Sequence, residues 1–225
     1  GKIVDTPKMN TFLRYEPGQE TRDIKTVFDF SKDLGILRAT EKCNGTGTCR
    51  KTEVIGGTMC PSYMVSRNEN QSTRARANLL REFLTNSSKA NPFDYKEIYE
   101  VMDLCLSCKA CKSECPSSVD IAKLKAEFLQ HYYADNRIPL RTLLIANISK
   151  VNKLGSNFPS LFNFFSQNFI TSRITSAVFG FTTKRRIPTL SKATLDRWHR
   201  LYKEVLNKKS FPNGKVYLFN DEFTR

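Results

Sequence analysis

The sequence lacks several features that define common classes of protein. Its 225 residues include only two histidines and one tryptophan, and they contain no Ser-His-Asp order, phosphate-binding loop or dinucleotide fingerprint. No run of about eighteen uncharged apolar residues could span a bilayer, and no charged and then apolar segment resembles a signal peptide. The chain therefore shows no evident apparatus for transforming a substrate, and a cytoplasmic, reducing setting is expected.

Cysteine is absent from most of the chain. All seven cysteines lie between Cys43 and Cys115, and the 110 residues that follow contain none. A disulfide framework would scatter its cysteines, whereas two tight clusters indicate ligands.

Acidic residues are too few to balance the basic ones. Thirty-six Lys and Arg stand against twenty-two Asp and Glu, which gives a net charge of +14. The basic residues are spread along the chain and are not interleaved with aromatics, which disfavours a nucleic-acid platform. We expect an anionic metal cluster to offset part of this charge and an acidic partner domain to offset the rest.

The most informative run is CLSCKACKSECP, which contains Cys105, Cys108, Cys111 and Cys115 followed by Pro116. This spacing is an iron–sulfur signature, in which three closely spaced thiolates bind one cluster and the fourth points to another. A structural zinc site usually has two Cys-x2-Cys pairs separated by a longer insert, so zinc is the weaker alternative.

The earlier cysteines form a similar motif that lacks one ligand. Cys43, Thr46 and Cys49 repeat the spacing of the later group with threonine in the middle, and Cys60 precedes a proline as Cys115 does. If the two motifs exchange their last cysteine, one complete 4Fe-4S site and one site with three thiolates result. The complete site would use Cys60, Cys105, Cys108 and Cys111, and the incomplete site would use Cys43, Cys49 and Cys115.

Three outcomes are open for the incomplete site. It could hold a 3Fe-4S cluster, a 4Fe-4S cluster completed by Thr46 or Asn44, or no cluster, because a hydroxyl is a weak ligand for such iron.

Arg74, Arg76 and Arg81 are either donors to cluster sulfurs or a solvated helix face. The histidines, His131 and His199, are expected to be surface or capping residues rather than ligands.

Apolar periodicity predicts helices and little strand. No β-alternation surrounds the cysteines, so we expect a mainly α fold with an all-helical, two-cluster ferredoxin-like domain and a helical extension. Helices are expected over residues 21–35, 69–84, 93–104, 139–150 and 191–206, and after a Ser118 cap with Ile121, Leu124 and Phe128 buried.

The C-terminal half contains two further features. A Phe-rich stretch from Phe158 to Phe181 is expected to be a buried face or a docking surface, with a membrane-surface anchor as the alternative because Lys184, Arg185 and Arg186 follow it. The run from Lys215 to Phe219 resembles the truncated first strand of a following α/β domain.

Four stretches of the chain carry a resemblance to a known family: CNGTGTCRK, GTMCPSY, STRARANLLRE and CLSCKACKSECPSSVDIAKLK. They closely resemble the iron–sulfur region of large fusion proteins that join an FAD-linked oxidase to an iron–sulfur oxidoreductase. These proteins are related to D-lactate and D-2-hydroxyglutarate dehydrogenases. More distantly, the double motif is similar to the iron–sulfur subunits of anaerobic glycerol-3-phosphate dehydrogenase, glycolate oxidase and heterodisulfide reductase, and to the helical half of the succinate dehydrogenase iron–sulfur subunit. The non-cysteine at position 46 is shared by the family, whereas Ala75 stands where relatives commonly have glycine.

The resemblance implies a place within a larger enzyme. A flavin domain with FAD would precede the chain and a cysteine-rich reductase-type domain would follow it, both as partners within the same full-length protein. The chain would then comprise a connector and short helix (1–40), the iron–sulfur domain (41–135), a helical extension (136–210) and a truncated start of the next domain (211–225).

The implied function is the relay of single electrons from a flavin that oxidises a D-2-hydroxy acid to a downstream acceptor. Two alternatives stay open. One is a subunit that docks at the inner face of the membrane and passes electrons to quinone, and the other is a zinc-stabilised basic domain that binds nucleic acid.

Overall fold

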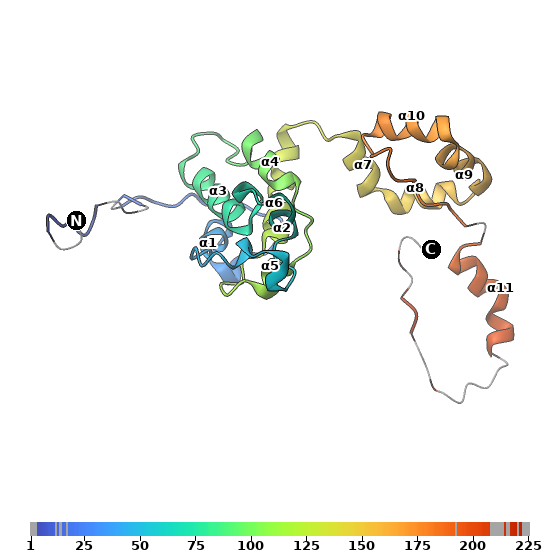
Figure 1. The fold of residues 1–225 in the computed structure, drawn as a ribbon, viewed down its shortest axis with the longest axis horizontal. Helices are drawn as coiled ribbons and strands as arrows, with labels where there is room; N and C mark the ends of the chain where they lie inside the picture. The colour runs from blue at the N-terminus through green and yellow to red at the C-terminus, as the bar shows by residue number, and fades with distance from the viewer. Residues whose placement is uncertain are drawn as a thin grey trace. The chain divides into compact units, whose positions relative to one another are not determined.

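The computed structural model describes residues 4–11, 13, 15–16, 18–191, 193–207, 214, 217–219 and 221 (Figure 1). The chain divides into two compact units, Gly1–Asn136 and Arg137–Arg225. Within the described residues all regular structure is helical, which confirms the predicted mainly α fold.

The first unit packs its helices around one hydrophobic core. α3 is central, since it contacts α1, α4 and α6. Four 3-10 helices connect or precede the α-helices: η1 (Ser31–Asp33), η2 (Thr48–Arg50), η3 (Glu53–Ile55) and η4 (Glu69–Gln71). The α-helices are α1 (Ile36–Glu41), α2 (Pro61–Ser66), α3 (Thr73–Asn86), α4 (Lys96–Asp103), α5 (Ala110–Glu114) and α6 (Ile121–Asp135).

α3 forms where the spacing of the apolar residues and a capping side chain both favour a helix. The Ser72 hydroxyl accepts a hydrogen bond of 3.0 Å from the backbone nitrogen of Ala75, which caps the helix. The predicted helix over 69–84 thus begins at Thr73, after η4. Its buried positions recur at helical spacing and form the face that meets the core: Thr73, Arg76, Ala77, Leu80 and Leu84.

Two other helix starts lie later than predicted. α4 begins at Lys96 because Asn91 Oδ1 accepts a hydrogen bond of 3.0 Å from the backbone nitrogen of Phe93 and holds that segment in a turn. α6 begins after Asp120, whose carboxylate caps it, whereas Ser118 has a φ of 49° and lies outside the helix. The predicted core positions Ile121, Leu124 and Phe128 are all buried.

The helix predicted over 21–35 is wrong. Glu127 of α6 accepts hydrogen bonds from the backbone nitrogens of Val27, at 2.7 Å, and Phe28, at 2.9 Å. These N–H groups are therefore not available to a helix, and the segment runs irregularly to η1. Gly35 then adopts a φ of 106°, which separates η1 from α1.

The helices of the second unit expose much apolar surface. The helix predicted over 139–150 is interrupted at Asn147, between α7 and α8. Phe158 is 67% exposed and Phe169 is 66% exposed, so these rings are not buried within the unit, and the docking surface for another domain stays a prediction. Leu201 is likewise 68% exposed. The helices are α7 (Leu140–Ala146), α8 (Ile148–Gly155), α9 (Pro159–Gln167), α10 (Phe169–Phe179) and α11 (Leu195–Asn207).

The strand predicted at Lys215–Phe219 is described only in part. Lys215 and Val216 lie outside the described residues, and Tyr217, Leu218 and Phe219 have no strand geometry.

Candidate metal centre

The seven cysteines line two cavities in the first unit. We call them the Cys60 cavity and the Cys43 cavity. Cysteines from both sequence motifs meet in each one, in the grouping that the exchange of last cysteines predicts. The Cys60 cavity is lined by Cys60, Cys105, Cys108 and Cys111, and the Cys43 cavity by Cys43, Cys49 and Cys115.

The two cavities share part of their walls. Met59 and Thr73 line both of them, and these side chains are 1% and 3% exposed. The cavities are therefore neighbours, separated by buried side chains and not by solvent.

Helix ends hold several of the cysteines. Cys60 is the N-cap residue of α2 and Pro61 is its first residue, a position where proline's fixed φ suits a helix. Cys111 lies within α5, and Cys115 follows its last residue. Lys109 precedes α5 with a φ of 62°, and Cys108 beside it is exposed.

Each cavity also faces the N-terminus of a long helix. The backbone nitrogen of Arg74, in the first turn of α3, donates to Cys49 Sγ at 3.4 Å. Burial raises the pKa of Cys49, and this hydrogen bond partly opposes the rise. Burial likewise raises the pKa of Cys111, opposed by the backbone N–H groups of Ile121 and Ala122 at the start of α6. Helix N-termini favour anions, which suits thiolates and the anionic clusters they bind.

The pKa of Cys60 is shifted in the opposite direction to those of the other buried cysteines, Cys49 and Cys111. Burial is the largest influence on its pKa and would raise it, but a hydrogen bond with Ser62 and the charge of Arg76 bring the pKa below its ordinary value. Ser62 Oγ lies 3.3 Å from the Cys60 sulfur. Arg76 Nη1 donates to the same sulfur at 3.4 Å.

The positively charged side chains near the Cys60 cavity suit a negatively charged group bound there. The side chain of Arg76 is fully buried, and none of the ion pairs among the described residues joins it to a carboxylate. Lys125 donates to the Cys105 carbonyl oxygen at 2.7 Å, and burial lowers its pKa. A buried cation requires a counter-charge, and thiolates with an iron–sulfur cluster would supply one. The residues present therefore fit such a cluster.

The non-cysteine position of the first motif lies at the Cys43 cavity. Asn44 and Thr46 both line it. The Asn44 side-chain oxygen accepts hydrogen bonds from the backbone nitrogen of Thr46, at 3.1 Å, and from the Thr46 hydroxyl. Both side chains are thus near the three cysteines, but in the structure they bind each other.

The arginines and the histidine considered as candidates from the sequence have different partners in the structure. Arg76 is a donor to a cysteine, whereas the Arg74 side chain pairs with Glu69 and the Arg81 side chain donates to Asn78. The signal for Arg76 was available in the sequence, since an arginine four residues before Leu80 falls on the apolar stripe of α3. His131 stacks on Phe93 at 4.5 Å between ring centroids and bonds to Glu127 at 2.9 Å, away from the cysteines.

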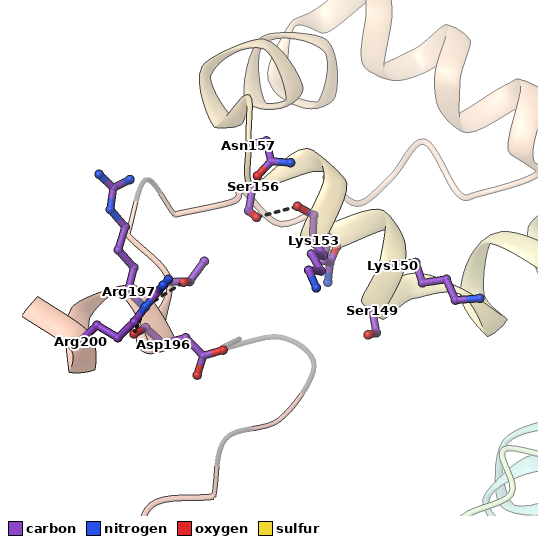
Figure 2. A pocket seen from close by; sticks show the side chains of 10 residues that line it. Ser149, Lys150, Lys153, Ser156, Asn157, Asp196, Arg197 and Arg200 are labelled. Carbon is purple, nitrogen blue, oxygen red and sulfur yellow. Dashed lines mark hydrogen bonds between the residues drawn. The ribbon is translucent and has the colours of Figure 1, made fainter.

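A separate cavity of about 540 Å³ lies in the second unit. Figure 2 shows Lys150 and Lys153 of α8 on one side and Arg197 and Arg200 of α11 on the other. No cysteine lines it, and it is not part of the candidate metal centre. Among the described residues, no three His, Cys, Asp or Glu side chains converge on a point that a single metal ion could occupy.

Comparison with known proteins gives the family of the cysteine-rich region. Residues 42–120, which include all seven cysteines, match the family described as the 4Fe-4S dicluster domain. This match confirms that the region is an iron–sulfur domain. Its all-helical, two-cluster character was predicted from the sequence.

The wider chain is homologous to D-2-hydroxyglutarate dehydrogenases, which confirms the resemblance drawn from its motifs. The Escherichia coli protein of that name is 28% identical over 83% of this chain and 22% of its own length. The Pantoea ananatis protein is 29% identical over 70% of this chain and 18% of its own, and that of Haemophilus influenzae is 26% identical over 72% and 18%. The chain thus spans about a fifth of the length of these relatives. No solved structure matches it.

Proposed function

We propose that this chain is the electron-relay module of a flavin-dependent dehydrogenase of D-2-hydroxy acids. The observation that carries the proposal is the pair of cysteine-lined cavities that share Met59 and Thr73 as walls. Two redox groups held in adjacent sites can exchange electrons through a thin layer of protein. The larger size of the dehydrogenases to which the chain is homologous supports additional domains in the same polypeptide, and we propose that one is a flavin domain and another a second redox domain.

The cysteines would act as ligands in the two groups that the cavities define. Cys60, Cys105, Cys108 and Cys111 would hold a 4Fe-4S cluster, and the group Cys43, Cys49 and Cys115 would hold a second cluster with three thiolates. When bound, such clusters accept and release one electron at a time without rearrangement of bonds. The protein fixes the thiolates at helix ends and keeps Cys49, Cys60 and Cys111 away from water.

The first test is the content of iron, labile sulfide and zinc per chain after anaerobic purification, with electron paramagnetic resonance of the oxidised protein. About eight irons, or about seven with an oxidised-state signal, would support two clusters. About four irons would leave the Cys43 cavity empty and contradict a two-centre relay. One or two zinc ions with little iron would overturn the redox function.

The second test concerns the relay itself. In the full-length protein, D-2-hydroxyglutarate should reduce the flavin and then bleach the visible absorption of the clusters. In a Cys60→Ala variant the flavin should still be reduced, while electrons should reach an artificial acceptor more slowly. An unchanged rate of acceptor reduction would show that the clusters are not on the electron path.

The distribution of charge favours a second candidate function, attachment to an anionic membrane surface. Residues 1–135 contain 20 Lys and Arg against 18 Asp and Glu, so this part of the chain is nearly balanced in charge. Residues 136–195 contain nine Lys and Arg and no acidic residue. The positive surplus is thus concentrated beyond the iron–sulfur domain.

The same region exposes apolar side chains next to its cations. On α10, Ile170, Ile174 and Val178 follow one another at four-residue spacing, and each is at least 59% exposed. Arg173, on the edge of this stripe, stacks over the ring of Phe169 at 4.0 Å. Both residues line a cavity together with Lys184, Arg185 and Arg186. Exposed apolar groups beside cations are typical of a protein surface that rests on anionic lipid.

None of the described helices has the length and apolar character needed to cross a bilayer, so the contact proposed is with the membrane surface. Flotation with vesicles tests it. Vesicles that contain phosphatidylglycerol should bind the chain, and vesicles of phosphatidylcholine alone should bind it weakly. Neutralising Lys184, Arg185 and Arg186 to glutamine should abolish flotation, whereas neutralising Lys25, Lys32 and Lys96 in the first unit should not. Equal loss in both variants, or no flotation of the wild type, would contradict lipid attachment.

A further inference from the structure

Arg76 makes four hydrogen bonds from a fully buried position on α3. Its Nη1 donates to Cys60 Sγ at 3.4 Å and to Ser62 Oγ at 3.1 Å. Its Nε donates to the Val101 carbonyl oxygen at 3.0 Å, and its Nη2 donates to Gln71 Oε1 at 2.9 Å. We propose that Arg76 positions Cys60 and raises the reduction potential of the cluster in the Cys60 cavity; this inference rests on the proposed function.

The charge of Arg76 supports the proposal. All its hydrogen-bond acceptors other than the sulfur are neutral oxygens. An unpaired buried guanidinium would be costly, because the protein interior screens charge poorly. The counter-charge that this site offers is the Cys60 thiolate and the cluster it binds.

The effect on potential has a definite sign. A cluster with four thiolate ligands carries net negative charge, and reduction adds one more negative charge to it. A fixed cation nearby therefore stabilises the reduced state more than the oxidised state. A hydrogen bond to a ligand sulfur acts in the same direction. Removing Arg76 should thus make the potential more negative.

The contacts of Arg76 also explain how it would position the thiolate. They join α3 to Ser62 of α2, to Gln71 of η4 and to Val101 of α4. Val101 lies four residues before Cys105, and Ser62 lies two residues after Cys60. One side chain thereby links the segments that bring Cys60 and Cys105 to the same cavity. The planar, rigid fork of arginine can serve these acceptors together, and the single ammonium of lysine cannot.

The chain offers a matched control two residues away. The Arg74 side chain forms an ion pair with Glu69 at 2.9 Å, and only its backbone nitrogen donates to a cysteine. Arg74→Gln therefore removes a positive charge from the same helix and keeps the backbone donor. It should leave the potential of the Cys60-cavity cluster nearly unchanged.

The experiment is a redox titration, monitored by electron paramagnetic resonance, of the iron-loaded wild-type chain and the variants Arg76→Lys, Arg76→Gln and Arg74→Gln. Iron and sulfide content are measured on each sample. We expect Arg76→Gln to shift the midpoint potential to a more negative value and to alter the line shape of the reduced cluster. Arg76→Lys keeps a charge without the full set of hydrogen bonds, so its shift should be smaller and of the same sign.

The outcomes separate this inference from the proposed function. A wild-type chain without an iron–sulfur signal would refute the proposed function itself. A loaded wild type with Arg76 variants of unchanged potential and line shape would overturn the role of Arg76 alone. A shift of equal size in Arg74→Gln would also overturn it, because the effect would then be general electrostatics. If Arg76→Gln does not retain iron, Arg76→Lys decides: a more negative potential supports the role, and an unchanged one refutes it.

Discussion

Glu114 Oε1 accepts a hydrogen bond of 2.7 Å from the backbone nitrogen of Thr58. The same carboxylate also accepts from the backbone nitrogen of Met59 at 3.2 Å and pairs with the Lys51 ammonium. These contacts lower the pKa of Glu114 to about 2, with the Lys51 hydrogen bond as the largest cause. Glu114 directly precedes Cys115, and Met59 directly precedes Cys60. One carboxylate therefore holds together the two segments whose cysteines the motifs exchange.

Replacing Glu114 should weaken both cysteine groups together. In Glu114→Ala the backbone N–H groups of Thr58 and Met59 lose their acceptor, so the segment that carries Cys60 is less firmly held against α5. We expect a lower Tm and faster release of iron to a chelator, affecting both clusters. Glu100→Ala, which removes an exposed partner of Lys96 on α4, should have little effect. Selective loss of one cluster in Glu114→Ala would contradict the shared role.

Gly57 provides a steric test of the same contact. An added Cβ at Gly57 would lie 2.1 Å from Lys51 Nζ and 2.5 Å from Glu114 Oε2, whereas one at Gly56 would meet nothing within 4 Å. Gly57 has a φ of 77°, so alanine there also strains the backbone. This strain cancels when the loss of Tm caused by Gly57→Ala is measured in the wild type and again in Glu114→Ala. We expect the smaller loss in Glu114→Ala, and equal losses would show that the Lys51–Glu114 pair contributes little.

The grouping of cysteines could be predicted because it depends on local spacing and on an internal repeat. Cys43 and Cys49 repeat the outer spacing of Cys105 and Cys111, and a proline follows the last cysteine of each motif. Helix positions followed in the same way from periodicity, as in α3.

The interactions that hold the site together could not be predicted so readily, because they join distant parts of the chain. Glu114 reaches a segment 56 residues earlier in the sequence. Glu127 reaches Val27 across 100 residues and, by accepting from its backbone, prevents the helix that local periodicity predicts. Local patterns contain no information about such partners. Arg76 is an intermediate case, since donation to a cluster sulfur was one of the two alternatives that the sequence left open for it, and only the structure selects it over Arg74 and Arg81.

If the two motifs exchange their last cysteines, each of these two cysteines should be needed for the cluster of the other motif. Cys60→Ala should remove the cluster that depends on Cys105, Cys108 and Cys111, although Cys60 lies in the first motif. Cys115→Ala should instead disturb the cluster held by Cys43 and Cys49, although it belongs to the second motif. Iron content and the resonance spectra of the reduced and oxidised proteins distinguish the two. If each variant loses the cluster of its own motif, the motifs do not exchange ligands.

Thr46→Cys should convert the site with three thiolates into one with four. Position 46 lines the Cys43 cavity beside Cys43 and Cys49, so a thiolate there is placed near the iron that lacks a cysteine ligand. Thiolate is a far better ligand for such iron than hydroxyl, so the corner iron should be retained during exposure to air. We expect the wild type to fall towards about seven irons per chain while Thr46→Cys stays near eight. Thr52→Cys, which places a thiol nearby in the sequence but outside both cavities, is the matched control and should lose iron as the wild type does. Equal iron loss in Thr46→Cys and the wild type would show that position 46 does not face the open corner of the cluster.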